Sequence, residues 1–583
     1  LTLENIILDG GDATVTGSMI GNGGTLEVAE DALIRGASIA GNGGAINSWN
    51  GEVHINGGKI TDCTATVYGG AVYATGGTVR ISAGSVEQCQ ADRGAAVYLK
   101  TGTVYMEGGK LENHRAQSGG AIYLEAGMAT ITDGILQNNA ATNGSGGAIR
   151  SENAYVTISG GTIKNNTASV NGGAIHMDTL TITISGGEIT ENTAGENGGA
   201  VWSGTGSVVI ATGAILSKNT AQAGNGGAVY TESSSFTMNG GTIEENSAGG
   251  NGGGVYVSTG MVSIEKNGNN ASVIKNNDAG GNGGGIYIGS GTGSNITSAK
   301  INGNNTTTQN GGGVFVDSGT VTLSNAEITE NKAANGAGVY TQNGQVTFNG
   351  GKVESNIASA GGAVGVGSVI TRVSFKGNIT IKNNTSSDGT ENRDVYLNFD
   401  TETILVAAGL EGSASVGIYV PGSMTDETDP QYNLFRNRGV PGAKFATYSS
   451  TSKIENFFND RLEGLSVEKD STGSAGRLYW NKAFPLEVRY LASYAEGLPP
   501  VKSGDFKKTI DPYNPPAGFN TASEIAEHVR TLYPNVIGSQ TAVFAHIFLS
   551  DAASFDEYII EINWDSTINS WVFVKRDGTK VSM

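Results

Sequence analysis

A short motif of two small residues followed by Val or Ile recurs thirteen times between Gly43 and Val364. Its copies follow one another at a spacing of about 26 residues, which is too short for a propeller blade. No helical pattern accompanies the motif, so we expect each copy to mark one coil of a parallel β-solenoid. The second small residue of each copy is Ala45, Ala71, Ala96, Ala121, Ala148, Ala174, Ala200, Ala228, Gly254, Gly285, Gly313, Gly338 or Ala363.

Composition limits the kinds of partner. The chain has 91 Gly and 10 Pro, but the glycines recur in register with apolar residues, which favours ordered turns over disorder. A formal net charge of −19 argues against nucleic acid or an anionic membrane as the partner, since both select a basic face. No apolar run is long enough to span a membrane and no export leader begins at Leu1, so we expect a mature or excised segment.

Each repeat contains three strand-like pieces. In one coil they are residues 173–177, 181–184 and 188–192. All three alternate with a period of two, so one side of each strand faces the interior. The Val or Ile after the small pair is never replaced by a polar residue, which predicts an inward column. About fourteen coils stacked at about 4.8 Å predict a rod about 70 Å long, in which only neighbouring coils touch.

A column of asparagines follows the third strand. We expect these side chains to form a buried ladder, because an amide can bond to the backbone and to the Asn of the next coil. Asparagine also tolerates the left-handed backbone conformation of a turn. The column comprises Asn139, Asn166, Asn192, Asn219, Asn246, Asn277, Asn304, Asn331, Asn356 and Asn384.

Three other residues occupy the start of this column: Cys63, Cys89 and His114. They are interpreted first as buried substitutes for asparagine. A disulfide between Cys63 and Cys89 stays open, because adjacent coils bring their α-carbons within range although the β-carbons point in parallel. A metal site or a thiol catalyst would need more ligands or partners than these three residues supply, so none is predicted.

The residue after each inward Val or Ile should point outward, and most of these residues are aromatic. Such rings suit the apolar faces of sugars or a partner protein. Stacking that merely stabilises the coils is the alternative, since Tyr is a good strand residue. The predicted ligand-binding residues are Tyr73, Tyr98, Tyr123, Arg150, His176, Trp202, Tyr230, Tyr256, Tyr287, Phe315 and Tyr340.

Carboxylates lie two positions further along these strands, at Glu125, Glu152, Asp178 and Glu232. On adjacent coils they would be about 5 Å apart, as in retaining glycosidases. Glu152 and Asp178, with Arg150 and His176 beside them, are therefore the candidate catalytic residues of an alternative, enzymatic reading. A solvated, salt-bridged patch explains the same pattern. No metalloprotease motif, nucleophile elbow or phosphate loop is present.

The repeat resembles that of bacterial β-helix surface proteins. Gly-Gly-Ala followed by Ile or Val, and later an apolar residue with Asn three positions on, is similar to the repeats of polymorphic outer-membrane proteins and of adhesin-like proteins. The resemblance covers roughly residues 20–390 and implies a right-handed parallel β-helix, exported to the cell surface and used for attachment. Ile163 stands where the outer-membrane family prefers Phe, which favours the adhesin-like group.

Three regions are predicted. Residues 1–392 form the β-helix, and residues 393–482 keep short strands without the glycine register, as a β-rich continuation that caps the helix. Residues 483–583 form a small α+β module that serves as a stalk or accessory domain. Its one helix begins at the capping box of residues 521–524 and stops at Pro534.

The sequence thus predicts an all-β solenoid with a cap and a small C-terminal α+β domain. Its predicted function is that of an extracellular adhesin-like protein of the bacterial cell surface, binding a glycan or a host or microbial surface protein along the aromatic face. A glycosidase or polysaccharide lyase and a passive spacer are the alternatives. No cofactor, metal, nucleic acid or membrane insertion is expected.

Overall fold

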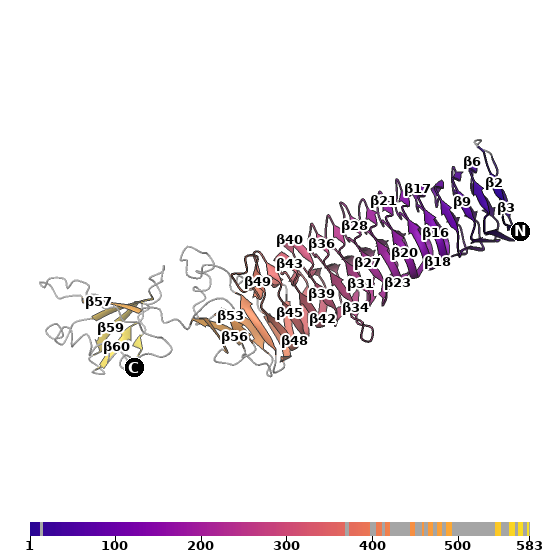
Figure 1. Ribbon diagram of the computed structural model, residues 1–583. Coiled ribbons are helices and arrows are strands. Elements are labelled where there is room, and N and C mark those ends of the chain that lie inside the picture. Colours follow the sequence, from indigo (N-terminus) through magenta and orange to yellow (C-terminus); the bar gives the residue numbers. More distant parts are fainter. Residues whose placement is uncertain are drawn as a thin grey trace. The chain divides into compact units, whose positions relative to one another are not determined.

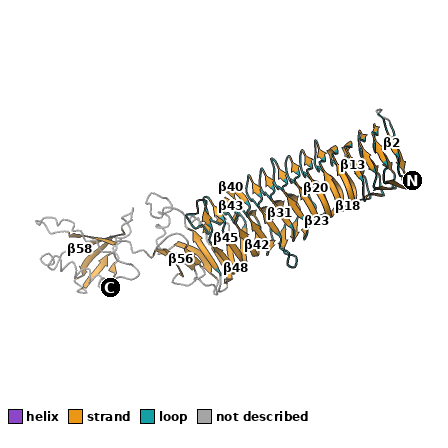
Figure 2. Ribbon diagram, viewed as in Figure 1, coloured by secondary structure: helices purple, strands orange, loops and turns teal. Residues whose placement is uncertain are grey.

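The fold is described from a computed structural model (Figure 1). The structure describes residues 1–11, 16–367, 372–396 and 414, together with the strands from β51 (Ile404–Leu410) to β61 (Lys580–Val581). The described residues are strands joined by turns, without a helix (Figure 2). None of this part of the chain therefore provides a helix that could cross a membrane.

The repeats wind into a parallel β-solenoid of about 14 turns, as predicted. One coil consists of β22 (Ile175–Met177), β23 (Ile182–Thr190) and β24 (Thr193–Ala194). The next consists of β25 (Val201–Ser203), β26 (Val208–Ala211), β27 (Ile215–Ser217) and β28 (Thr220–Ala221). Every pairing between these two coils is parallel and in register. The second and third predicted strands run together in β23 and stay separate in β26 and β27.

The Val or Ile column lies inside, as the alternation predicts. Ile175 pairs with Val201, Val201 pairs with Val229, and all three side chains are fully buried. The second strand adds larger residues to the core, among them Phe236, Phe348 and Phe375. Burial of this continuous apolar column is the main stabilising contribution that adjacent coils make to one another.

A fourth strand position, which was not predicted from the sequence, forms a separate sheet. Fourteen short strands, from β6 (Ser38–Ile39) to β49 (Thr385–Ser386), pair in chain order along one edge of the solenoid (Figure 1). Their inward residue is usually a small buried Ala, such as Ala168, Ala194 and Ala221. These strands are only two to six residues long, so their alternation is too short to recognise in the sequence.

The glycines of the repeat motif are fixed by backbone contacts. Gly226 has a φ of +70°, and a β-carbon there would lie 2.4 Å from the carbonyl oxygen of Val229. A β-carbon on Gly227 would lie 2.1 Å from the carbonyl oxygen of Gly253 in the next coil. The first glycine therefore provides a left-handed turn and the second allows two coils to approach each other closely.

The asparagine ladder is present and buried. Asn219, for example, accepts bonds at Oδ1 from the backbone nitrogen and Nδ2 of Asn192, at 3.1 and 3.0 Å. Its own Nδ2 donates to the Ile189 carbonyl and to Asn246 Oδ1, both at 2.9 Å. The ladder ends where Asn384 Nδ2 donates to the buried carboxylate of Asp394 over 2.7 Å. Each amide thus satisfies buried backbone groups of neighbouring coils.

The left-handed residue of this turn is not the ladder asparagine, which corrects the prediction. The preceding residue has the positive φ, for example 56° at Glu191, 54° at Lys218 and 56° at Glu245. Asn165 and Asn276 occupy this position in other coils, but Glu, Lys and Ser are accepted there too, so the turn does not require asparagine. The ladder position is selected by its buried hydrogen bonds.

Cys63, Cys89 and His114 occupy the ladder as buried substitutes. Both cysteines are free thiols, so the disulfide alternative is wrong in this structure. Their sulfurs lie 3.2 Å from the carbonyl oxygens of Thr61 and Glu87, respectively. Burial raises the pKa of the Cys89 thiol, which keeps it protonated and unreactive.

Beyond the regular coils, parallel pairing continues. β48 (Arg372–Lys382) pairs with β51 and with β52 (Ser415–Tyr419). The assignment of residues 393–482 as a continuation that caps the solenoid stays a prediction. Separately, β57 (Leu486–Ala492), β58 (Val543–Leu549), β59 (Ile559–Asp565), β60 (Ser570–Val574) and β61 form an antiparallel sheet in chain order. The predicted helix before Pro534 lies outside the described residues.

Candidate functional site

The predicted ligand-binding residues lie in one register of the first-strand sheet. Tyr73 in β11 (Val72–Ala74) pairs with Tyr98 in β15 (Val97–Leu99), and the series continues coil by coil to Tyr340 in β44 (Val339–Thr341). It ends where Tyr340 pairs with Gly365. We call this series the ring row: Tyr73, Tyr98, Tyr123, Arg150, His176, Trp202, Tyr230, Tyr256, Tyr287, Phe315 and Tyr340.

The rings form two stacks separated by Arg150. In the first stack, Tyr98 and Tyr123 have centroids 5.3 Å apart, and Tyr68 from the preceding turn stacks on Tyr98 at 4.3 Å. The second stack runs from His176 through Trp202 to Tyr340 without interruption, with centroid distances from 4.1 to 6.2 Å. The ring planes are nearly parallel, at 4° between Tyr230 and Tyr256. Most ring faces are therefore covered by other rings.

The structure corrects the expectation of an open strip of ring faces. Tyr98 and Tyr123 are 2% exposed, and His176, Phe315 and Tyr340 are also buried. The other five rings are half-buried: Tyr73, Trp202, Tyr230, Tyr256 and Tyr287. Because the faces of these five rings are covered by stacking, a ligand can contact only their edges and their polar tips.

Burial also fixes the protonation of the tyrosines. It raises the pKa of Tyr230 to about 12, with smaller contributions from Tyr256 and Glu232. It likewise raises the pKa of Tyr98, whose hydroxyl donates to Glu125 over 2.9 Å. These hydroxyls are therefore neutral donors at neutral pH.

Charged groups gather where the two stacks meet. Arg150 donates from Nη2 to Asp178 Oδ2 over 2.6 Å, and Asp178 Oδ1 lies 3.0 Å from Nε2 of His176. Burial lowers the pKa of His176 to about 4, against the opposite effect of Asp178, so its ring is neutral at neutral pH. Burial opposes ionisation of Asp178, but the hydrogen bond from His176 and the charge of Arg150 hold its pKa below the ordinary value.

A second polar cluster adjoins the first stack. The Tyr123 hydroxyl donates to Glu152, and Arg93 lies 3.1 Å from that hydroxyl and 3.4 Å from the same carboxylate. The Arg93 guanidinium also lies over the Tyr123 ring, 5.1 Å from its centroid. Arg93 and Tyr68 were not among the residues predicted from the sequence. Both lie five residues before a ring of the row, and this offset is the signal that could have identified them.

The two candidate catalytic carboxylates have different partners. Glu152 is held by Tyr123 and Arg93, whereas Asp178 is held by Arg150 and His176. A carboxyl group with a lowered pKa, as in Asp178, is a poor proton donor at neutral pH. The ion pairs and hydrogen bonds of Glu152 and Asp178 are better explained as a network that holds side chains of different coils in fixed positions. In the described part of the chain, no three His, Cys, Asp or Glu side chains gather closely enough to hold a metal ion.

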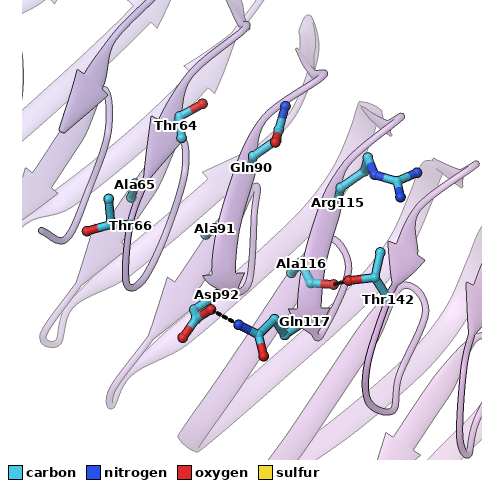
Figure 3. Close-up of a pocket in the computed structure, with 10 residues that line it drawn as sticks. All are labelled: Thr64, Ala65, Thr66, Gln90, Ala91, Asp92, Arg115, Ala116, Gln117 and Thr142. Carbon is cyan, nitrogen blue, oxygen red and sulfur yellow. Dashed lines mark hydrogen bonds between the residues drawn. The ribbon is translucent and has the colours of Figure 1, made fainter. Parts of the chain in front are cut away.

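A shallow polar depression lies away from the ring row, on the fourteen-stranded sheet (Figure 3). It has a volume of about 360 Å³ and spans β10 (Thr64–Ala65), β14 (Gln90–Arg93) and β17 (Arg115–Ser118). Gln117 donates to Asp92 across it, and Thr142 donates to the Ala116 carbonyl over 3.1 Å. Asp92 and Gln117 are the one pair of lining side chains with a hydrogen bond between them, and the lining residues match no catalytic pattern.

A family model, the Chlamydia polymorphic membrane protein repeat, matches residues 160–178. The matched segment runs from the third strand through the ladder residue Asn166 to Gly172, Gly173 and Ile175, so it contains both motifs of one coil. No curated protein and no solved structure shows a significant match to the chain. The repeats therefore form a parallel β-solenoid, and one of its coils is similar to the repeat of the Chlamydia polymorphic membrane proteins.

Proposed function

We propose that this protein is an adhesin-like protein of the bacterial cell surface that binds a glycan or a surface protein along the ring row. The related repeat supports a surface protein, since it is named after membrane proteins of Chlamydia. A solenoid of stacked coils also suits attachment, because it presents one row of side chains over a long distance.

The second ring stack carries the proposal. It continues unbroken over seven residues, from His176 to Tyr340, and its members Trp202, Tyr230, Tyr256 and Tyr287 are half-buried and so partly accessible. Seven coils span about 30 Å, which matches an extended ligand better than a single small molecule. The ligand meets ring edges, the Trp202 indole and neutral hydroxyls, with Glu232 and Asp317 nearby.

A glycan array tests this proposal with the wild-type protein, Trp202→Ala and Trp49→Ala. Trp49 is a matched control because it follows a first strand, β7 (Ile46–Ser48), is 55% exposed and lies outside the ring row. We expect glycan binding that Trp202→Ala weakens and Trp49→Ala retains. For a protein ligand, binding to intact host or bacterial cells should show the same difference between the two variants.

Three results would contradict the proposal. One is the absence of wild-type binding to both arrays and cells, which favours a passive spacer. Another is equal binding by wild type and Trp202→Ala. The third is release of sugar products from a polysaccharide, abolished by Asp178→Asn, which would make the protein an enzyme.

A further inference from the structure

A second outward column, on the second-strand sheet, is rich in hydroxyl groups. Thr130 in β18 (Ile122–Gln137) pairs with Thr157 in β20 (Ile149–Lys164), and Thr157 pairs with Thr183 in β23. The same register continues through Val209 and Asn295 to β48. We call its hydroxyl-bearing members the hydroxyl row: Thr130, Thr157, Thr183, Thr237, Ser263, Thr322, Thr347 and Ser374.

The hydroxyl groups of this row are free of protein partners. Among the described residues, none of the eight donates or accepts a side-chain hydrogen bond within the chain, and each residue is half-buried. Threonines elsewhere on the surface bond back to the backbone: Thr179 donates to the Glu152 carbonyl over 2.8 Å, and Thr101 to the Thr75 carbonyl over 2.9 Å. The hydroxyl groups of this row can therefore form hydrogen bonds to a ligand in place of those that they make to water.

The face around this row is almost uncharged. In the described stretch from Tyr155 to Thr347, the outward positions of these strands include one ionisable side chain other than tyrosine, Glu265. The neighbouring third-strand positions are different, because they carry ion pairs such as Lys275 with Glu244 at 2.8 Å and Lys300 with Glu327 at 3.8 Å. A neutral face on a chain with a net charge of −19 is suited to a neutral partner.

An accessible aromatic ring lies on the same face. Tyr155, two residues before Thr157 on β20, is 52% exposed, and it stacks on no other ring in the described part of the chain. Its neighbour across the strands is Met128. Tyr155 thus differs from the rings of the ring row, because its face is open to contact the apolar face of a sugar.

We propose that the hydroxyl row and Tyr155 form a second docking surface, which binds an uncharged polysaccharide chain. Hydroxyl groups that both donate and accept are complementary to sugar hydroxyls, and they recur at about 4.8 Å along a straight row. Between Tyr155 and Thr347, Glu265 is the one ionisable outward side chain other than tyrosine that the structure describes on these strands, so this surface provides no positive charge to attract an anionic glycan. This site is separate from the ring row, and its existence does not depend on the function proposed for that row.

Co-sedimentation with insoluble cellulose and insoluble mannan, and binding to immobilised polygalacturonate, test the proposal. Thr183→Glu places a charge in the row and is compared with Thr220→Glu, an equally half-buried threonine on the fourteen-stranded sheet. We expect wild type to bind a neutral polymer, and Thr183→Glu to raise the apparent Kd about tenfold or more because the new carboxylate must be desolvated. Thr220→Glu should bind this polymer like wild type.

Tyr155→Ala provides a second variant that adds no charge, and it should weaken binding to the same polymer several-fold. Circular dichroism confirms that each variant is folded. The proposal is overturned if wild type binds neither neutral polymer, if it prefers polygalacturonate, or if Thr183→Glu and Thr220→Glu bind equally. Self-association of wild type that Thr183→Glu abolishes, without polymer binding, would identify the face as an interface between copies.

Discussion

At the scale of single residues, His114 shows what a ladder position requires. Its Nδ1 accepts from the Cys89 backbone nitrogen over 3.2 Å, and its Nε2 lies 3.0 Å from the Val86 carbonyl oxygen. The imidazole therefore takes the place of an amide, with one acceptor and one donor, only in its neutral form. Protonation would convert the acceptor into a second donor that faces another donor.

The first prediction follows from the protonation of His114. Burial lowers its pKa to about 4 in the folded protein, so the unfolded chain binds a proton first as the pH falls. The stability of these coils should be constant above about pH 6.5 and decline as the pH falls from there toward about 4. His114→Asn should weaken this decline while it keeps the ladder bonds. Thermal unfolding at pH 7.5 and pH 5 measures the difference.

His176 provides the internal comparison, because burial lowers its pKa to about 4 as well. His114→Asn should therefore remove only part of the acid sensitivity, and the double variant with His176→Gln should remove more. An unchanged pH dependence in His114→Asn would show that the imidazole is not held in its neutral form.

The second prediction concerns Asn219, in the middle of the ladder. Asn219→Ala leaves the Ile189 carbonyl and the Asn192 backbone nitrogen without their side-chain partner in a fully buried site. We expect a loss of about 3 kcal/mol, since each unsatisfied buried group costs about 1 to 3 kcal/mol. Hydrogen exchange should increase in the coils on either side of residue 219. Loss of protection spread evenly over the solenoid would contradict coupling between nearest neighbours.

The ladder could be predicted from the sequence because its spacing is constant and its chemistry is specific. The exact left-handed residue of its turn could not be predicted, because Asn165, Lys218 and Ser355 all occupy that position and have no side-chain type in common. The choice between thiols and a disulfide at Cys63 and Cys89 was also left open. Both outcomes fit the same α-carbon spacing, and only side-chain direction separates them.

At the scale of the element, the repeat glycines control how a coil turns. Gly226→Ala places a β-carbon 2.4 Å from the Val229 carbonyl oxygen at a φ of +70°. The third prediction is a loss of about 2 kcal/mol or more, from left-handed strain together with the clash. Gly23→Ala is the control, because a β-carbon at Gly23 has no neighbour within 4 Å, and it should change stability by less than about 0.5 kcal/mol. Equal melting temperatures for the two variants would contradict this account.

Element patterns were predictable where strands are long enough to alternate. The first strand was assigned correctly, with Val201 and Val229 inward and Trp202 and Tyr230 on the other side. Strand alternation predicts only the face of the sheet on which a ring lies, and not how exposed the ring is. The burial of Tyr98 and Tyr123 follows from stacking between coils and from Arg93 at the end of β14, and these contacts are known only from the three-dimensional structure.

At the scale of the whole solenoid, the described strands of each coil pair only with strands of the adjacent coils, so a complete coil should be removable. Residues 200–227 comprise β25 to β28, and their deletion joins Gly199 to Ala228. Val229 then takes the position of Val201 above Ile175, and Asn246 takes that of Asn219 above Asn192. The inward column, the ladder and the ring row all remain continuous in the shortened chain.

The fourth prediction is that this deletion variant folds, with a solenoid shorter by about 4.8 Å and only a small change in melting temperature. Deletion of residues 214–227 removes half of the same coil and places a first strand where a third strand belongs. That variant should lose the register of every column and fail to form a continuous solenoid. Circular dichroism and small-angle scattering distinguish the two outcomes. If both deletions disrupt folding equally, long-range cooperativity and not contact between adjacent coils stabilises the structure.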